Sequence, residues 1–232
     1  MTADGASCSD NGQAAPDVPR QAADGPDQGE RTPRDAADPP SHLAIALATS
    51  GATRRPRLVF ATHNAHKVRE VTAILGEAMV LEPGVIVGAD AVGAGEVTET
   101  GVTFAENALL KARTLVRSTG MAAFADDSGL CVDVLGGAPG VFSARWAGGH
   151  GDDAANLALL LDQLRDVPAG RRGAWFECVA ALVTPSGEEW VETGRLPGTL
   201  TTAPCGEAGF GYDPIFLPSG GARTCAQSPP AE

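Results

Sequence analysis

The order of strand-like and helix-like patterns is the feature that most constrains the fold of this chain. A short apolar run at residues 57–62 is followed by a polar turn and then, from Lys67, by a helical pattern that Gly76 is placed to end. The apolar residues of this helix are predicted to share one buried face: Val68, Val71, Ile74 and Leu75. A strand that leads directly into a helix is typical of an anion site, because the free amides and the positive dipole end of the helix point at the turn.

The remaining predicted strands and helices alternate at first, and the last two strands pair with each other. Two more helices are predicted, at Thr103–Gly120 and Asp153–Leu164, and three more strands, at residues 85–87, 175–183 and 189–195. Thr103 and Glu106 have the spacing of a capping box, and the turn at residues 184–187 joins the last two strands as a hairpin. Strands and helices that alternate early, with strands that pair later, predict an α/β fold with a mixed sheet.

The composition changes near residue 55. Residues 1–40 contain almost no large apolar side chains and cannot bury enough surface to offset their chain entropy. We interpret residues 1–55 as a disordered or misannotated N-terminal extension, and residues 56–232 as one domain with a sizeable core. The apolar run Leu43–Ala48 is too short to span a bilayer, and no signal-peptide pattern stands at the very start.

The charge balance argues against a polyanionic partner. The chain has 29 acidic and 17 basic residues, a formal net charge of -12, and shows no stripe of clustered Lys and Arg. Nucleic acid and membrane partners are therefore not expected, whereas a small anionic ligand held locally remains possible. The 5 cysteines are scattered without a CxxC pair, which indicates neither a disulfide framework nor a zinc site and fits a cytoplasmic protein.

Two adjacent carboxylates, Asp126 and Asp127, follow the apolar run at residues 121–124, which is predicted to be a short buried strand. Ser128 and a turn-forming glycine, Gly129, come next. Adjacent acids repel one another unless a cation or a hydrogen-bonding network neutralises them. Mg²⁺ accepts carboxylate oxygens and usually keeps a phosphate as a further ligand, so it is the favoured neutraliser. The alternative is a solvated turn at the strand end, because Asp, Ser and Gly are common turn residues.

Two loops that precede helices carry further candidates. Thr62 and Asn64 can hydrogen-bond phosphate oxygens, and Lys67 adds a compact positive charge. The alternative is an ordinary helix start with Asn64 as N-cap and Lys67 in solvent. No Gly-Lys-Ser/Thr sequence occurs, which excludes a Walker loop. Glu99, before the second long helix, could reach the same cleft and supply a metal ligand, or could be a solvated loop acid.

Two glycine-containing segments complete the candidates. Tyr212 is the only tyrosine and stands beside Phe210 and Asp213 in a loop. Exposed aromatic rings on such a loop can stack on a nucleobase, a contact of roughly 1–3 kcal/mol per base. The alternative is a tight turn with Tyr212 packed against the core. Residues 136–146 are either a rigid cleft wall that carries Arg145 or a turn before a core aromatic residue.

Taken in order, these segments resemble the inosine/xanthosine triphosphate pyrophosphatase family, over roughly Arg57 to Glu232. The matching segments are residues 61–70, 99–108, 125–130, 136–141 and 209–216. The resemblance implies an elongated α/β fold with a mixed twisted sheet flanked by helices and a central cleft between two lobes, commonly as a homodimer. It also implies Mg²⁺-dependent hydrolysis of ITP, dITP or XTP to monophosphate and pyrophosphate. The alternatives are an inactive nucleotide-binding remnant and a pyrophosphatase with relaxed or pyrimidine base preference.

The same resemblance assigns roles to residues. Asp127 matches the general base and a metal-contacting acid, and Glu99 matches the second metal-linked acid. The residues that match substrate contacts are Thr62, His63, Asn64, Ala65, His66, Lys67, Ser128, Phe210, Gly211, Tyr212 and Asp213. Lys67 is also assigned a catalytic role, since attack of water on the α-phosphorus needs a base and cations that neutralise the phosphate oxygens, without a protein nucleophile.

The resemblance breaks off at the C-terminal end. The family continues with a lysine and a Ser-His-Arg segment that opens a helix and contacts the purine base, whereas this sequence ends at residues 228–232. The domain is therefore expected to lack its C-terminal helix. Base selectivity is expected to be weak, because selectivity comes from hydrogen bonds that a wrong base leaves unpaired. Exposed apolar surface is expected to lower stability.

Overall fold

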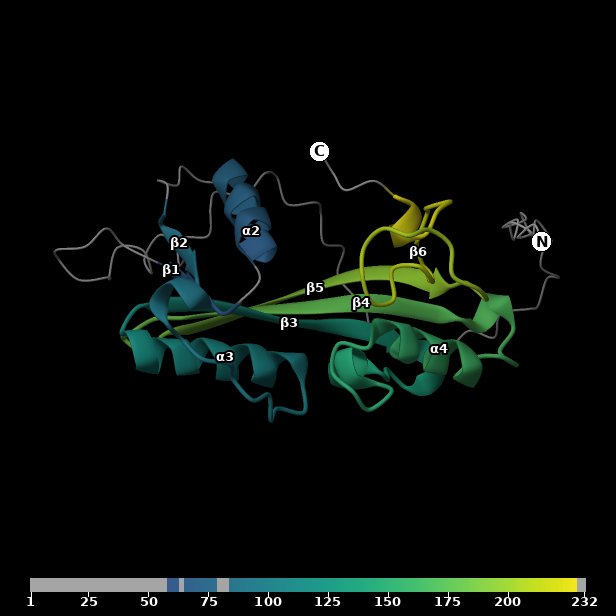
Figure 1. Ribbon diagram of the computed structural model, residues 1–232, viewed down its shortest axis with the longest axis horizontal. Coiled ribbons are helices and arrows are strands. Elements are labelled where there is room, and N and C mark those ends of the chain that lie inside the picture. Colours follow the sequence, from purple (N-terminus) through teal and green to yellow (C-terminus); the bar gives the residue numbers. More distant parts are fainter. Residues whose placement is uncertain (1–57, 63–64, 79–83, 229–232) are drawn as a thin grey trace, which may run out of the picture. The chain divides into compact units, whose positions relative to one another are not determined.

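The computed structural model describes residues 58–62, 65–78 and 84–228, so the expectations for residues 1–55, His63 and Asn64 lie outside it. Its strands form one 6-stranded sheet in the order β2-β1-β3-β4-β5-β6 (Figure 1). The strands are β1 (Leu58–Phe60), β2 (Ile86–Gly88), β3 (Ala122–Val132), β4 (Gly173–Val183), β5 (Glu189–Leu200) and β6 (Phe216–Pro218). β1 is parallel to β2 and β3, and β3 to β6 are antiparallel. The predicted mixed α/β sheet is confirmed.

Two helices cover opposite faces of this sheet, α2 (Ala65–Ala78) and α3 (Phe104–Thr119) (Figure 1). Phe60 and Ala122 belong to the core beneath α2, whereas Val59 and Ala123 belong to the core beneath α3. This division follows from the alternation of side chains along a strand. Consecutive residues of β3 therefore point toward different helices, which decides where its acidic residues lie.

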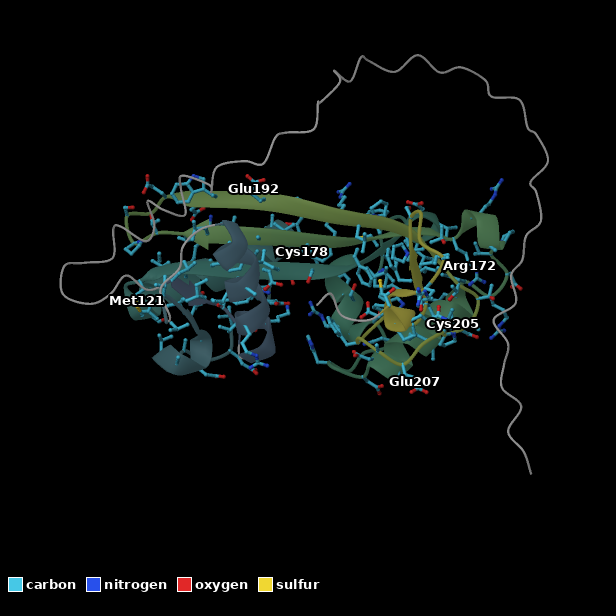
Figure 2. The ribbon with its side chains drawn as sticks, turned by 90° about the horizontal axis from the view of Figure 1, so that it is seen from above. Met121, Arg172, Cys178, Glu192, Cys205 and Glu207 are labelled. Carbon is cyan, nitrogen blue, oxygen red and sulfur yellow. The ribbon has the colours of Figure 1, made fainter. Side chains whose placement is uncertain are left out.

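A separate core fills the other end of the sheet, where helix α4 (Asp153–Gln163) packs. Its buried residues are Leu130, Val132, Leu160, Leu164, Ala174, Leu200, Tyr212, Ile215 and Phe216. Arg172, directly before β4, is buried at this end, opposite the end marked by Met121 (Figure 2). Across the described residues, no helix combines the length and the apolar character that crossing a membrane requires.

Two predictions about α2 are wrong. Gly76 does not end the helix, which continues to Ala78. A glycine inside a helix costs only about 0.5–1 kcal/mol, so the remaining turns tolerate it. Ile74 is 65% exposed, and the apolar face is formed by Val68, Val71 and Leu75. The position of α2 on the sheet, rather than its apolar spacing alone, selects which residues are buried.

The predicted strand end after Phe124 is also wrong. β3 continues through Asp126 and Gly129 to Val132, and it pairs with β4 from Ala123 onward. Gly129 is not a turn residue. A Cβ atom at this position would lie 2.5 Å from the carbonyl oxygen of Gly140 and 2.5 Å from Oγ of Ser143. Glycine is needed here because another segment of the chain lies directly against the strand.

We expect Gly129→Ala to lower the free energy of unfolding by about 1–3 kcal/mol, because the added methyl group forces the 140–143 segment away from β3. Urea unfolding measures the change. Gly194→Ala on β5 is the matched control, since its added Cβ would meet only the carbonyl oxygen of Cys178, at 4.0 Å. Equal stabilities of the two variants would contradict the close approach at Gly129.

Candidate active site

The cleft lies beside β3 at the point where its neighbour β1 stops. β1 pairs with Ala122–Phe124 only, so no strand among the described residues pairs with Asp126–Ser128 on that side. The cavity beside them has a volume of about 1000 Å³. Its walls come from the end of β1, from α2 and α3, from the loop at residues 95–99 and from the segment at residues 141–150. Thr62, Lys67 and Ser128, all predicted substrate contacts, line this cavity.

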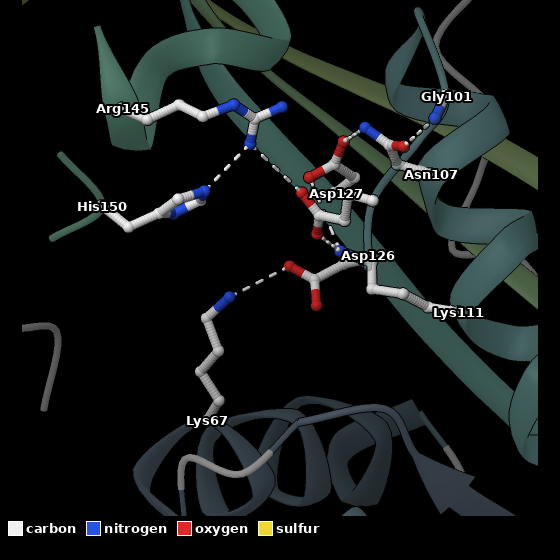
Figure 3. A network of polar contacts seen from close by, with 9 residues as sticks. Lys67, Gly101, Asn107, Lys111, Asp126, Asp127, Arg145 and His150 are labelled. Atoms are coloured by element: carbon white, nitrogen blue, oxygen red, sulfur yellow. Dashed lines mark hydrogen bonds and ion pairs between the residues drawn. The ribbon is translucent and has the colours of Figure 1, made fainter. Parts of the chain in front are cut away.

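The two adjacent carboxylates each have their own partners (Figure 3). Asp126, on the α2 face, accepts a hydrogen bond from Nζ of Lys67 at 3.1 Å. Asp127, on the α3 face, accepts one from Nδ2 of Asn107 at 3.0 Å and lies 3.5 Å from Nζ of Lys111. Both side chains are mostly buried, 18% and 12% exposed. The interpretation of this sequence as a solvated turn is therefore wrong.

Glu99 is brought to Asp127 by a shared cation. Nζ of Lys111 donates to Oε1 of Glu99 at 2.8 Å while it contacts Oδ1 of Asp127. On the other side, the guanidinium of Arg145 lies 3.9 Å from Oε2 of Glu99. The predicted pair of acids thus converges on one positive charge, although the two residues come from different segments.

Asn107, which the sequence reasoning did not assign to the site, holds these segments together. The predicted capping box of Thr103 and Glu106 is confirmed, and Asn107 follows it, fully buried. Oδ1 of Asn107 accepts from the amide of Gly101 at 2.8 Å, and a Cβ atom on Gly101 would lie 2.6 Å from this oxygen. Because its Nδ2 also bonds Asp127, Asn107 fixes the loop that carries Glu99 relative to β3.

Lys111 was also missed, although the sequence carries a signal for it. Asn107 and Lys111 are four residues apart and therefore share one face of α3. That face also includes Phe104 and Ala108, which are buried. A polar pair on the buried side of a helix indicates a polar partner on the element it packs against.

The structure describes only some of the predicted substrate contacts near the start of α2. Ala65 is the first residue of the helix and His66 the second. Thr62 precedes the helix, and its carbonyl oxygen accepts from the amide of Ala89 at 3.1 Å. His63 and Asn64 lie outside the described residues.

The predicted nucleoside loop presents one aromatic ring and buries the other. Phe210 is 77% exposed and lines the cleft. Tyr212 is 5% exposed, and its hydroxyl donates to the carbonyl oxygen of Ser143 at 3.0 Å. The loop is further held because Asp213 accepts from the amide of Phe210 and Asp153 accepts from the amide of Gly211. Tyr212 thus packs into the core, and Phe210 is the ring available for stacking.

Residues 136–146 combine the two interpretations of that segment. A 3₁₀ helix at Gly140–Arg145 places Arg145 in the wall of the cleft. Trp146, the next residue, packs against the core around α4. The segment is therefore both a cleft wall and a support for the core.

Burial raises the pKa of Asp127 above its usual range, and the negative charge of Glu99 adds to this effect. The charge of Lys111 and the hydrogen bond from Asn107 oppose it. A carboxyl group with a raised pKa is a better proton acceptor, because basicity increases with pKa as long as the group stays ionised. The direction of this shift is compatible with the general-base role that the sequence resemblance assigns to Asp127.

We expect Lys111→Met to raise the pKa of Asp127 further, because the variant removes the largest interaction that lowers it. The ¹³C chemical shift of the Asp127 carboxyl, followed against pH without divalent ions, measures the change. Lys67→Met is the matched control and should leave the midpoint in place, since Lys67 pairs with Asp126 instead. A midpoint that falls in the Lys111 variant would contradict the assigned electrostatics.

The side chains that could coordinate a metal ion suit magnesium better than an ion that is coordinated by protein atoms alone. Among the residues that the structure describes, no group of three or more His, Cys, Asp or Glu side chains could hold a metal ion. Glu99 and Asp127 do converge on one cation, the ammonium of Lys111. Mg²⁺ is usually bound by one or two carboxylates together with water and substrate phosphates. Two carboxylates beside a cleft lined with lysines suit an ion that arrives with a phosphate.

The fold and the cleft define an α/β protein whose cleft is lined by both carboxylates and cationic side chains. The sequence model of the Ham1 family matches residues 58–232. The chain therefore belongs to the Ham1 family, as the ordered segments of the sequence indicated.

Relatives and solved structures agree with this membership. The chain is 60% identical over 172 residues to the dITP/XTP pyrophosphatase of Streptomyces avermitilis, covering 74% of this chain and 85% of that protein. It is 57% identical over 177 residues to the dITP/XTP pyrophosphatase of Nocardia farcinica, covering 75% and 85%. The crystal structure of the Mycobacterium abscessus nucleoside-triphosphatase / dITP/XTP pyrophosphatase matches with 51% identity and a TM-score of 0.66, covering 75% and 90%. The Staphylococcus aureus Ham1 protein matches with 36% identity and a TM-score of 0.66, covering 75% and 86%.

Proposed function

We propose that this protein hydrolyses non-canonical purine nucleoside triphosphates, ITP, dITP and XTP, to the monophosphate and pyrophosphate. The observation that carries this proposal is the convergence of Glu99 and Asp127 on one cation in a cleft that Lys67 also lines. The names of the relatives support the class of substrate. Such an enzyme would act in the cytoplasm and remove unwanted nucleotides before polymerases use them.

The side chains of the cleft divide the chemistry among them. Asp127, oriented by Asn107, accepts the proton of the attacking water. Lys67, directed by Asp126, neutralises phosphate oxygens. Mg²⁺, when bound by Glu99 and Asp127, would supply further neutralisation and favour ionisation of water. Water bonds to the α-phosphorus as the bond to the bridging oxygen breaks, and pyrophosphate leaves.

The proposal is tested by pyrophosphate release from inosine triphosphate with and without Mg²⁺, compared with xanthosine, deoxyuridine and adenosine triphosphates. We expect release that depends on Mg²⁺ and that favours inosine and xanthosine triphosphates by only a small factor, in line with the weak base selectivity expected from the sequence. Binding of inosine triphosphate without release of pyrophosphate would contradict the proposal and favour a nucleotide-binding remnant. Equal turnover of deoxyuridine triphosphate would instead favour a pyrophosphatase with relaxed base preference.

We also propose that the protein forms a homodimer, as the family resemblance implies. Val191 on β5 is 40% exposed, and association through this face of the sheet would cover its apolar side chain. Sedimentation equilibrium measures the mass in solution. A monomer throughout the micromolar range would contradict the proposal.

A further inference from the structure

Arg145 contacts two neighbours in the wall of the cleft. Its guanidinium carbon lies 5.4 Å from the centre of the Phe142 ring. Its NH1 group lies 3.3 Å from Nε2 of His150. A guanidinium only donates hydrogen bonds, so Nε2 of His150 is the acceptor in this contact. The side chain is thus fixed in a direction that brings its tip toward the acidic residues (Figure 3).

Most hydrogen-bond donors of Arg145 are unused. Lys67 and Lys111 contact carboxylates at 3.1 and 2.8 Å, whereas Arg145 reaches Glu99 only at 3.9 Å. Within the described part of the chain, no residue accepts from Nε or NH2 of Arg145. A guanidinium with free donors, 23% exposed and fixed in a cleft wall, matches the paired oxygens of a phosphate.

Arg145 and Lys67 reach the acidic residues at opposite ends of the row, Arg145 at Glu99 and Lys67 at Asp126 (Figure 3). The segment that carries Arg145 is joined to the Phe210 loop, since the carbonyl oxygen of Ser143 accepts from the hydroxyl of Tyr212. Lys67 instead belongs to α2, at the other wall. A nucleotide that stacks its base on Phe210 and extends its terminal phosphates to Lys67 therefore passes Arg145 before it reaches the acidic residues.

We propose that Arg145 binds the α-phosphoryl group of the substrate on the nucleoside side of the carboxylates, while Lys67 binds the pyrophosphate side. This inference rests on the proposed function for the identity of the substrate. Negative charge on the α-phosphoryl oxygens shifts as water attacks and the bridging oxygen leaves, and a preorganised guanidinium stabilises it. Arg145 therefore contributes to the rate of the chemical step as well as to affinity.

The test compares two variants with two probes that divide the substrate at the scissile bond. Isothermal titration with Mg²⁺ present measures the binding of inosine monophosphate and of inorganic pyrophosphate. We expect Arg145→Gln to weaken binding of the monophosphate by about 10- to 100-fold and to leave pyrophosphate binding unchanged. Lys67→Gln should show the reverse pattern. Arg113→Gln, which removes an exposed ion pair with Glu189, should change neither.

Kinetics provide the second part of the test. Arg145→Gln should lower kcat for inosine triphosphate by about 10- to 100-fold. Arg145→Lys should recover part of the loss, because lysine keeps the positive charge but lacks the paired N–H donors of the guanidinium. If Arg145→Gln does not fold, the affinity of Arg145→Lys for inosine monophosphate is measured in its place and tests the inference. Weakened pyrophosphate binding with unchanged monophosphate binding, or no change in either, would overturn the inference. If the parent protein released no pyrophosphate, the proposed function would fail, while the two binding measurements would still decide the position of Arg145.

Discussion

Replacing Asp127 with asparagine is expected to lower kcat for pyrophosphate release by about 100- to 10,000-fold. Asparagine can still accept the hydrogen bond that Nδ2 of Asn107 donates at 3.0 Å, but it cannot take a proton from water. The replacement therefore keeps the local geometry and removes the basic function. Initial rates with inosine triphosphate at saturating Mg²⁺ measure the effect.

Stability and a control variant complete this experiment. Burial already disfavours the charged form of Asp127, so the neutral side chain should not destabilise the protein, which thermal unfolding measures. Asp166→Asn, in the exposed loop after α4, makes the same chemical change away from the cleft and should leave kcat unchanged. A folded Asp127→Asn variant with nearly the parent kcat would refute the assigned base.

Arg172→Ala is expected to lower the free energy of unfolding by about 3–5 kcal/mol. Arg172 is 3% exposed, and its guanidinium donates to the carbonyl oxygens of Leu164, Val167 and Thr201 at 2.7, 3.0 and 3.1 Å. These bonds join the C-terminal end of α4 to the residue that follows β5. The alanine variant leaves the carbonyl groups without this donor and opens a cavity beside them.

Urea denaturation measures this loss in the free energy of unfolding. Arg171→Ala, at the preceding exposed position, removes the same side chain without breaking these bonds, and it should stay within about 0.5 kcal/mol of the parent. A similar small loss in both variants would show that the buried guanidinium does not hold the α4 end of the sheet.

The sequence predicted those features that short segments determine. The capping box of Thr103 and Glu106 and the hairpin turn at residues 184–187 depend on neighbours within a few residues, and both are found. The mixed sheet followed from the order of such segments. The continuation of β3 through Asp126 and Gly129 could not be predicted in this way, because pairing with β4 overrides the turn preference of these residues.

The sequence identified residues of the candidate site, but it did not predict how their side chains are arranged in space. The sequence indicated that Glu99 and Asp127 act together, yet the lysine between them depends on how α3 lies on β3. The choice between Phe210 and Tyr212 as the exposed ring likewise depends on a partner far along the chain, Ser143. Contacts of this kind follow from packing, which the local pattern of one segment does not contain.

Hydrolysis of inosine triphosphate in ¹⁸O-labelled water, followed by mass spectrometry of both products, tests the central claim most directly. If water beside Asp127 attacks the α-phosphorus, the label enters inosine monophosphate and the pyrophosphate stays unlabelled. Label in the pyrophosphate would mean attack at the β-phosphorus, which the proposed arrangement of Glu99, Asp127 and the two flanking cations does not allow.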